Sequence, residues 1–212
     1  MQYLKEEVRL EIMKAALEEF KQNGFEKTSM KNISSNAGVA IGNIYRYFKN
    51  KQELFNAIVE PVQSYITTVI FNKFLPASSD SSVRFNLIDL VDSIMNVDLS
   101  YSAELMIMVY KSKGTNYENT KGYLIDLVYK RLKLEYLPII EKQRIDNCEQ
   151  FLQVFATVLI DGMFTVLRST ENVIEKRGLI NQLLLFYFNK LDERFIWNFF
   201  LSKNERIFIL QI

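Results

Sequence analysis

Five cations stand close together near the N-terminus, in a stretch that contains no acid. They are Lys27, Lys31, Arg46, Lys49 and Lys51. No Asp or Glu occurs between Glu26 and Glu53. Cations without neighbouring carboxylates bind phosphates, and this binding weakens as salt rises because counterions are released. The window therefore indicates a polyanionic partner, although the net charge of +1 and the pI of about 7.7 give the whole chain no such attraction.

The segment around these cations combines small and aromatic side chains in a pattern that suits a nucleic-acid groove. It reads GVAIGNIYRYFKNKQELF over residues 38–55, and helical spacing places Ile44 and Phe48 on one inward face. The outer face then carries Ala40, Gly42, Asn43 and Tyr47, with Ile41 and Tyr45 at its margins. Small residues allow close approach to a groove floor, an amide can bond a base edge, and tyrosine hydroxyls and lysines bind phosphates.

Several of these residues also have a plainer interpretation. Arg46 can pair with Glu53, Lys49 can be a solvated loop lysine, and Gly42 can merely loosen its helix. Glycine within a short helix costs about 1 kcal/mol relative to alanine, which favours a close-approach role for Gly42. Four inward residues are interpreted as core: Ile44, Phe48, Leu54 and Phe55.

Catalytic chemistry is poorly represented in the sequence. There is no histidine, and the single cysteine, Cys148, lies in RIDNCEQF without an evident base beside it. No phosphate-binding glycine loop and no metal-ligand spacing occurs. We therefore expect no enzyme activity, no cofactor and no metal.

The elements that position the basic window are four short, sharply bounded helices. The first has an apolar face from Val8 to Phe20 and ends at Asn23-Gly24, where the chain tolerates a left-handed conformation. Thr28 or Ser29 caps the second. The third runs from about Ala40 to Phe48, and the fourth begins at Asn50 or Lys51. Two short helices joined by a glycine-containing turn predict a helix-turn-helix at about residues 28–48.

Helical periodicity continues through the rest of the chain, so the predicted fold class is all-α. Apolar residues recur at helical spacing from Leu87 to Met95 and from Phe151 to Met163. Turn-forming residues at 76–82 and 111–122 predict loops, and Pro138 is expected to kink or end a helix. The most apolar run, Val154 to Leu167, contains Asp161 and is shorter than the roughly 20 residues of a membrane span, so we expect a cytoplasmic protein with no membrane partner.

About sixty N-terminal residues of the chain closely resemble the DNA-binding domain of the TetR (tetracycline repressor) family. The resemblance is carried by Ala15 through Phe20, Gly24-Phe25, Thr28-Ser29-Met30, Ile33, Ala37-Gly38-Val39, Gly42, Ile44-Tyr45, Tyr47-Phe48, Asn50-Lys51 and Glu53-Leu54-Phe55. It implies a helix-turn-helix DNA-binding domain at residues 1–60 and a larger helical ligand-binding and dimerisation domain at 61–212. It further implies a homodimer whose two recognition helices enter successive major grooves of a palindromic operator.

The resemblance also assigns roles to individual positions. Phosphate binding is expected of Thr28, Ser29, Tyr47 and Lys51, and DNA contact is preferred over plain surface for the last two. Base contact is expected of Ala40, Ile41, Gly42 and Asn43. Tyr45 and Arg46 are expected to touch the backbone or thymine methyl groups, and Lys49 is added as a further cation. Because Ala40, Ile41 and Gly42 offer little side-chain hydrogen bonding, readout is expected to depend on apolar contact and DNA shape.

The C-terminal region is expected to bind a second copy of the chain and a small molecule. The step Asp161-Gly162 within an apolar helix is similar to the family's dimerisation helix, and Asp161 and Arg168 can pair across a dimer or orient a bound molecule. The segment from Glu175 to Phe200 is apolar on most faces, which predicts a four-helix dimer interface. Methionines and aromatics can line an apolar pocket but are more often core.

The function expected from these features is a ligand-responsive transcriptional regulator. A repressor released from its operator by a small apolar molecule fits best. One alternative is a helical carrier or enzyme whose N-terminal helices are only structural. Another is an adaptor that uses the helix-turn-helix against protein, which the lysine-rich window disfavours.

Overall fold

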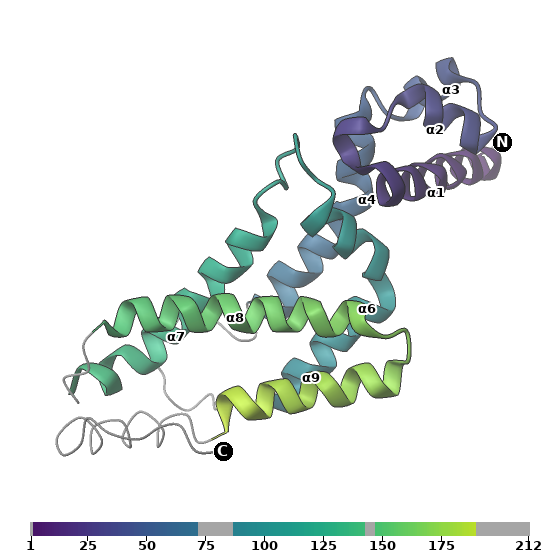
Figure 1. The fold of residues 1–212 in the computed structure, drawn as a ribbon. Coiled ribbons are helices and arrows are strands. Elements are labelled where there is room, and N and C mark those ends of the chain that lie inside the picture. Colours follow the sequence, from purple (N-terminus) through teal and green to yellow (C-terminus); the bar gives the residue numbers. More distant parts are fainter. Residues whose placement is uncertain (1, 72–86, 143–146, 190–212) are drawn as a thin grey trace. The chain divides into compact units, whose positions relative to one another are not determined.

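The structure is a computed structural model that describes residues 2–71, 87–142 and 147–189 (Figure 1). Within these ranges the chain is helical and contains no strand, so the predicted all-α class is confirmed. The elements are α1 (Gln2–Lys27), α2 (Met30–Ala37), α3 (Ile41–Tyr47), α4 (Lys51–Tyr65), the π-helix η1 (Ile66–Phe71), α6 (Leu87–Tyr110), α7 (Thr120–Lys142), α8 (Cys148–Ser169) and α9 (Val173–Phe188).

The chain divides into two compact units. The first comprises Met1–Val83 and Asp92–Thr120, and the second comprises Arg84–Val91 and Lys121–Ile212. Helix α6 therefore has residues in both units. The division expected after residue 60 falls inside α4, and the first unit continues beyond it.

Local signals set the bounds of the N-terminal helices. Helix α1 is interrupted at Gly24, where φ is 73° and ψ is 166°, at the predicted end of the first helix. Ser29, rather than Thr28, caps α2, because its Oγ accepts a hydrogen bond from the Asn32 N–H at 3.1 Å. Gly38 ends α2 in the left-handed conformation with φ of 63°. Asn50 caps α4 by accepting from the Glu53 N–H at 2.8 Å.

The core of the first unit is built on aromatic rings from α1 and α4. The rings of Phe20 and Phe55 meet edge to face with centroids 5.0 Å apart, and Phe25 meets Phe55 at 5.3 Å. All four residues predicted to face inward, Ile44, Phe48, Leu54 and Phe55, are buried. Each such side chain stabilises the fold by about 1.5–3 kcal/mol. The exposure of Ile41, Gly42, Asn43, Tyr45 and Arg46 on α3 agrees with this packing.

In the second unit, α8 packs against both α7 and α9, and Figure 1 shows α8 and α9 running antiparallel. Leu132 of α7 packs with Leu152 and Ala156 of α8 at the centre. At Gly162 the helices are close, because a Cβ atom there would lie 3.3 Å from the Leu183 side chain of α9. Helix α7 continues past Pro138 to Lys142, so the proline does not end it.

The connections between helices agree with the sequence where the structure describes them. Helix α6 ends at Tyr110 and α7 begins at Thr120, which confirms the loop predicted at 111–122. The loop predicted at 76–82, and residues 190–200 of the predicted dimerisation segment, lie outside the described residues.

The length of helix α8 differs from the expectation that the most apolar run is shorter than a membrane span. At 22 residues it is longer than the run from Val154 to Leu167, and in the described part of the chain it alone is long and apolar enough to cross a membrane. Core helices of soluble proteins meet the same criterion. One face of α8, which includes Leu152, Ala156 and Phe164, is buried within the protein.

Candidate nucleic-acid interface

Helix α3 presents a continuous outer face to solvent. Ile44 and Phe48 are buried beneath it. The exposed residues are Ala40, Ile41, Gly42, Asn43, Tyr45 and Arg46. Ile41 and Tyr45 are large apolar or aromatic side chains, yet 41% and 49% of their surfaces remain exposed. These six residues, all predicted to contact bases or backbone, are accessible, whereas Tyr47 of the predicted outer face is half-buried.

Gly42 has no packing role within the described protein. A Cβ atom added there would have no neighbour within 4 Å. Glycine is a weak helix former, and the packing of the protein does not require it at this position. The missing side chain leaves a flat spot between Ile41 and Asn43 where another molecule can approach the backbone.

The polar groups of α3 contact each other rather than the rest of the protein. The Arg46 Nη1 group donates a hydrogen bond to Asn43 Oδ1 at 3.4 Å. Glu53 instead accepts from the backbone N–H of Lys49 at 2.9 Å. The alternative pairing of Arg46 with Glu53 is therefore not formed.

The two hydroxyls before α2 lie in different environments. Ser29 is exposed, and its Oγ acts as acceptor to α2, which leaves the hydroxyl hydrogen to donate outward. Thr28 is only 3% exposed, and its hydroxyl donates to the carbonyls of Gly24, at 2.8 Å, and Glu19, at 3.3 Å. A hydroxyl has one hydrogen, so the Thr28 side chain has none for a phosphate. The expected phosphate contact of Thr28 is not supported.

Lys51 is turned toward the end of α1. Its Nζ donates hydrogen bonds to the carbonyl oxygens of Phe25, Glu26 (3.3 Å) and Thr28 (2.8 Å), and it lies 4.3 Å from the centroid of the Phe25 ring. Burial lowers the pKa of this ammonium group, an effect that the charge of Glu26 partly opposes. An ammonium has three hydrogens, and here three carbonyls receive them. In this arrangement all three N–H groups of Lys51 are engaged within the protein, and the phosphate contact expected of Lys51 stays a prediction.

Other cations of the acid-free window remain at the surface. Lys27, Lys31 and Lys49 are exposed. Tyr47, of which phosphate binding was also expected, is half-buried. Lys27 and Lys31 were part of the charge pattern in the sequence but were not assigned as individual contacts. Their exposure on the unit that carries α3 makes them further candidates for phosphate binding.

Among residues 2–71, 87–142 and 147–189, no group of three or more Cys, Asp or Glu side chains is arranged to hold a metal ion.

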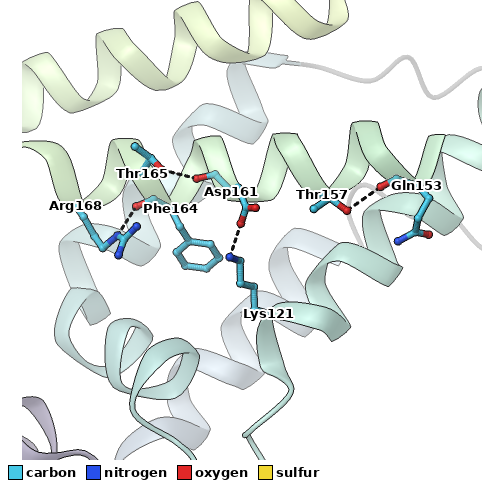
Figure 2. A network of polar contacts seen from close by, with 7 residues as sticks. All are labelled: Lys121, Gln153, Thr157, Asp161, Phe164, Thr165 and Arg168. Atoms are coloured by element: carbon cyan, nitrogen blue, oxygen red, sulfur yellow. Dashed lines mark hydrogen bonds and ion pairs between the residues drawn. The ribbon is translucent and has the colours of Figure 1, made fainter. Parts of the chain in front are cut away.

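The two charged residues singled out on α8 are engaged within their own unit (Figure 2). The Asp161 carboxylate forms an ion pair with Lys121 of α7. The Arg168 Nε donates to the carbonyl of Phe164 at 3.1 Å, and the Thr165 hydroxyl donates to the carbonyl of Asp161 at 2.7 Å. The Asp161 carboxylate therefore joins α8 to α7.

Helices α8 and α9 also expose large apolar side chains. Val154 is 60% exposed and Phe186 is 67% exposed. Further exposed members of this surface are Phe151, Val158, Val173, Ile174 and Leu185. Apolar side chains of this size at exposed positions are candidates for an interaction surface. We call these seven residues the α8–α9 apolar surface.

Comparison with known proteins identifies the N-terminal domain. Residues 12–58 match the profile of the family described as bacterial regulatory proteins, tetR family. The HTH-type transcriptional regulator AcrR of Shigella flexneri is 36% identical over 90 residues, which is 42% of each chain. The uncharacterized HTH-type regulator YfiR of Bacillus subtilis is 39% identical over 56 residues, 26% of this chain and 27% of the relative. The probable acrEF/envCD operon repressor of Escherichia coli is 35% identical over 66 residues, 28% of this chain and 30% of the relative.

These alignments span less than half the length of each relative, whereas similarity of fold extends further. A TetR-like transcriptional regulator from Rhodococcus sp. RHA1 superposes with a TM-score of 0.57 at 17% identity, over 86% of this chain and 96% of the other. The SmeT–triclosan complex gives a TM-score of 0.51 at 18% identity, over 84% and 90%. The helix-turn-helix and the matched profile agree that residues 12–58 form a domain of the family described as bacterial regulatory proteins, tetR family, and the similarity of fold extends over most of the chain.

Proposed function

We propose that this protein is a cytoplasmic transcriptional regulator that binds double-stranded DNA as a homodimer, with α3 of each protomer in the major groove. The observation that carries the proposal is the outer face of α3. Six adjacent residues are exposed there, one is a glycine that packing does not require, and the surrounding window contains cations without acids. A helix with a flat, accessible face and nearby cations suits a groove bordered by phosphates.

Within this surface the residues divide into two roles. Exposed Ser29, Lys31 and Lys49 bind phosphates and fix the orientation of the helix, while Asn43 bonds a base edge. Ile41 and Tyr45 add apolar contact. Phosphate contacts supply most of the affinity and make it salt-dependent, and the few base contacts supply the preference for sequence.

The α8–α9 apolar surface supports the proposed homodimer. A second copy related by a two-fold axis covers the same side chains in both protomers, which removes apolar surface from water. A two-fold dimer carries two copies of α3 and therefore binds a palindromic operator with half-sites about one helical turn, or more, apart.

We further propose that the protein is a repressor released by a small apolar molecule. Two comparisons support this: one relative is described as a probable operon repressor, and a protein of the same fold was solved with triclosan. Release by a ligand requires that the ligand binds the DNA-incompatible state of the dimer more tightly than the DNA-bound state.

The DNA-binding proposal is tested by a gel-shift titration. The probes are a duplex from upstream of the protein's own coding region and a scrambled duplex of the same composition, each at two salt concentrations. We expect retardation of the upstream duplex that is stronger than that of the scrambled one and that weakens with salt. Equal retardation of both duplexes, or none, would contradict sequence-specific binding.

A further inference from the structure

Glu19 of α1 carries a buried carboxylate that contacts α2. Only 7% of the residue is exposed. Its Oε1 accepts a hydrogen bond from the side-chain amide of Asn36, in the last turn of α2, and its Oε2 accepts one from the amide of Asn23 at 3.2 Å. A buried carboxylate is costly unless donors satisfy it, so these two amides fix the position of the side chain.

The main chain of the same residue contacts the chain at the other end of α2. The carbonyl oxygen of Glu19 accepts a hydrogen bond from the Thr28 hydroxyl at 3.3 Å, two residues before α2 begins at Met30. Asn36, in contrast, is the last residue but one of this helix, which ends at Ala37. One residue of α1 therefore holds the chain at both ends of α2, which fixes the position and the direction of this eight-residue helix.

Ser34 of α2 restrains the turn that leads from α2 to α3. Its hydroxyl donates a hydrogen bond to the carbonyl oxygen of Val39 at 2.6 Å, and its own carbonyl oxygen accepts from the Val39 N–H at 3.2 Å. Val39 lies between Gly38, which ends α2 in the left-handed conformation, and Ala40, which precedes α3. Both main-chain polar groups of Val39 are therefore bonded to one residue of α2.

These hydrogen bonds form a continuous path from α1 to α3. Glu19 holds the last turn of α2 through Asn36. Ser34, on the same helix, holds Val39, two residues before α3 begins at Ile41. Because α3 has only seven residues and follows this turn directly, the direction of α3 depends on how the turn is held.

We propose that Glu19 and Ser34 are positioning residues that determine sequence specificity without touching DNA, because they hold α2 and the turn so that the outer face of α3 meets base edges. The proposal rests on the DNA-binding function proposed above. A hydrogen bond to a base requires donor and acceptor about 3 Å apart, whereas lysines reach phosphates through long, flexible stems. Loss of either restraint therefore weakens binding to the preferred sequence more than binding to an arbitrary sequence.

Two pairs of neighbouring residues test the proposal in the full-length protein. Glu19→Gln removes the charge and one of the two acceptor oxygens that the amides use, and Glu18→Gln removes the same charge from an exposed side chain. Ser34→Ala removes the hydroxyl that restrains the turn, and Ser35→Ala removes a hydroxyl from the next, exposed residue. Loss of a carboxylate charge strengthens binding to any duplex, so Glu18→Gln controls for this effect.

The quantity measured is the specificity ratio, the affinity for the upstream duplex divided by the affinity for the scrambled duplex, by fluorescence anisotropy at one salt concentration. We expect this ratio to fall by about two- to tenfold in Glu19→Gln and in Ser34→Ala, the range that one hydrogen bond supplies. In Glu18→Gln and Ser35→Ala it is expected to equal the wild-type ratio. Ser34→Thr, which keeps the hydroxyl, is expected to restore the wild-type ratio. Urea unfolding shows whether each variant is folded under the conditions of the titration.

The outcomes separate a positioning role from a purely structural one. An unchanged specificity ratio in folded Glu19→Gln or Ser34→Ala, with or without a loss of stability, would overturn the positioning role of that residue. An equal fall of the ratio in the neighbouring control would overturn it as well. If Glu19→Gln does not fold, Asn36→Ala replaces it with the same expected ratio, because it removes the donor at the exposed end of the same contact. Failure of the wild-type protein to prefer the upstream duplex would instead overturn the DNA-binding proposal, and this one with it.

Discussion

Gly42 separates the requirements of the fold from those of DNA binding. Because a Cβ atom there meets nothing within 4 Å, Gly42→Ala is expected to stabilise the protein by up to about 1 kcal/mol through better helix propensity. The added methyl group occupies the flat spot on α3, so affinity for the operator is expected to fall. Urea unfolding and anisotropy titration measure the two effects. Increased stability with unchanged operator affinity would show that Gly42 does not contact the DNA.

Thr28 and Ser29 provide a second test of the proposed DNA contacts, because the Thr28 side chain is buried whereas Ser29 is exposed. Thr28→Val removes a buried donor to the Gly24 carbonyl and is expected to destabilise the fold by about 1–3 kcal/mol. At a temperature where the variant is folded, its DNA affinity and salt slope are expected to match wild type.

Ser29→Ala is the matched variant. It removes the α2 cap, at a cost of about 1 kcal/mol, and also an outward hydroxyl. Its affinity for DNA is expected to fall. A larger loss of DNA affinity in folded Thr28→Val than in Ser29→Ala would show that Thr28, and not Ser29, contacts the DNA.

Among the elements, α7 and α8 are joined by an exposed charge cluster whose effect depends on pH. The Glu149 carboxylate accepts hydrogen bonds from Lys133 Nζ at 2.9 Å and from the Tyr129 hydroxyl at 3.1 Å, and these bonds lower its pKa. A carboxyl with a lowered pKa in the folded state stabilises the protein above its unfolded pKa, and this contribution is lost as pH falls through the folded value.

Glu149→Gln is therefore expected to flatten the acid side of the stability profile. The urea midpoint of the wild-type protein should fall more than that of the variant between about pH 6 and pH 3, the range that spans ordinary glutamate titration. The difference should be small and should shrink at high salt, because the cluster is exposed. Parallel profiles for the two proteins would show that the contact does not persist in solution.

The sequence predicted the N-terminal elements well because their signals are local. Gly24, Ser29, Gly38 and Asn50 act within a few residues of themselves, and the spacing of inward residues fixes which face of α3 is exposed. The hydrogen bonds of Thr28 and Lys51 could not be predicted in this way, because they depend on carbonyls brought close by tertiary packing, which no short pattern encodes. The family resemblance favoured phosphate for both residues, whereas the structure places both against α1.

For the whole molecule, the proposed dimer through the α8–α9 apolar surface makes a prediction about assembly and DNA binding. Val154→Glu and Phe186→Glu place charges on exposed positions, so each protomer is expected to fold normally while the dimer dissociates. Operator affinity should then fall steeply, because the two DNA-binding domains are no longer held together in one dimer. Sedimentation velocity and circular dichroism measure assembly and folding.

Leu134→Glu is the matched control for this prediction. Leu134 is 73% exposed but lies on α7, outside the α8–α9 apolar surface. This variant is expected to assemble and bind DNA as wild type does. Dissociation by Leu134→Glu and not by the other two substitutions would move the dimer interface to α7.

The most direct test of α3 as the groove-binding helix is to map where it lies on DNA. A DNA-cleaving iron chelate is attached to Asn43→Cys in a Cys148→Ser background, and cut positions are read on the upstream duplex. We predict two clusters of cuts, related by two-fold symmetry and separated by about one helical turn or more, as expected for a dimer with one α3 in each half-site. A single cluster, or cuts spread evenly along a duplex that the protein nevertheless retards specifically, would contradict this role for α3.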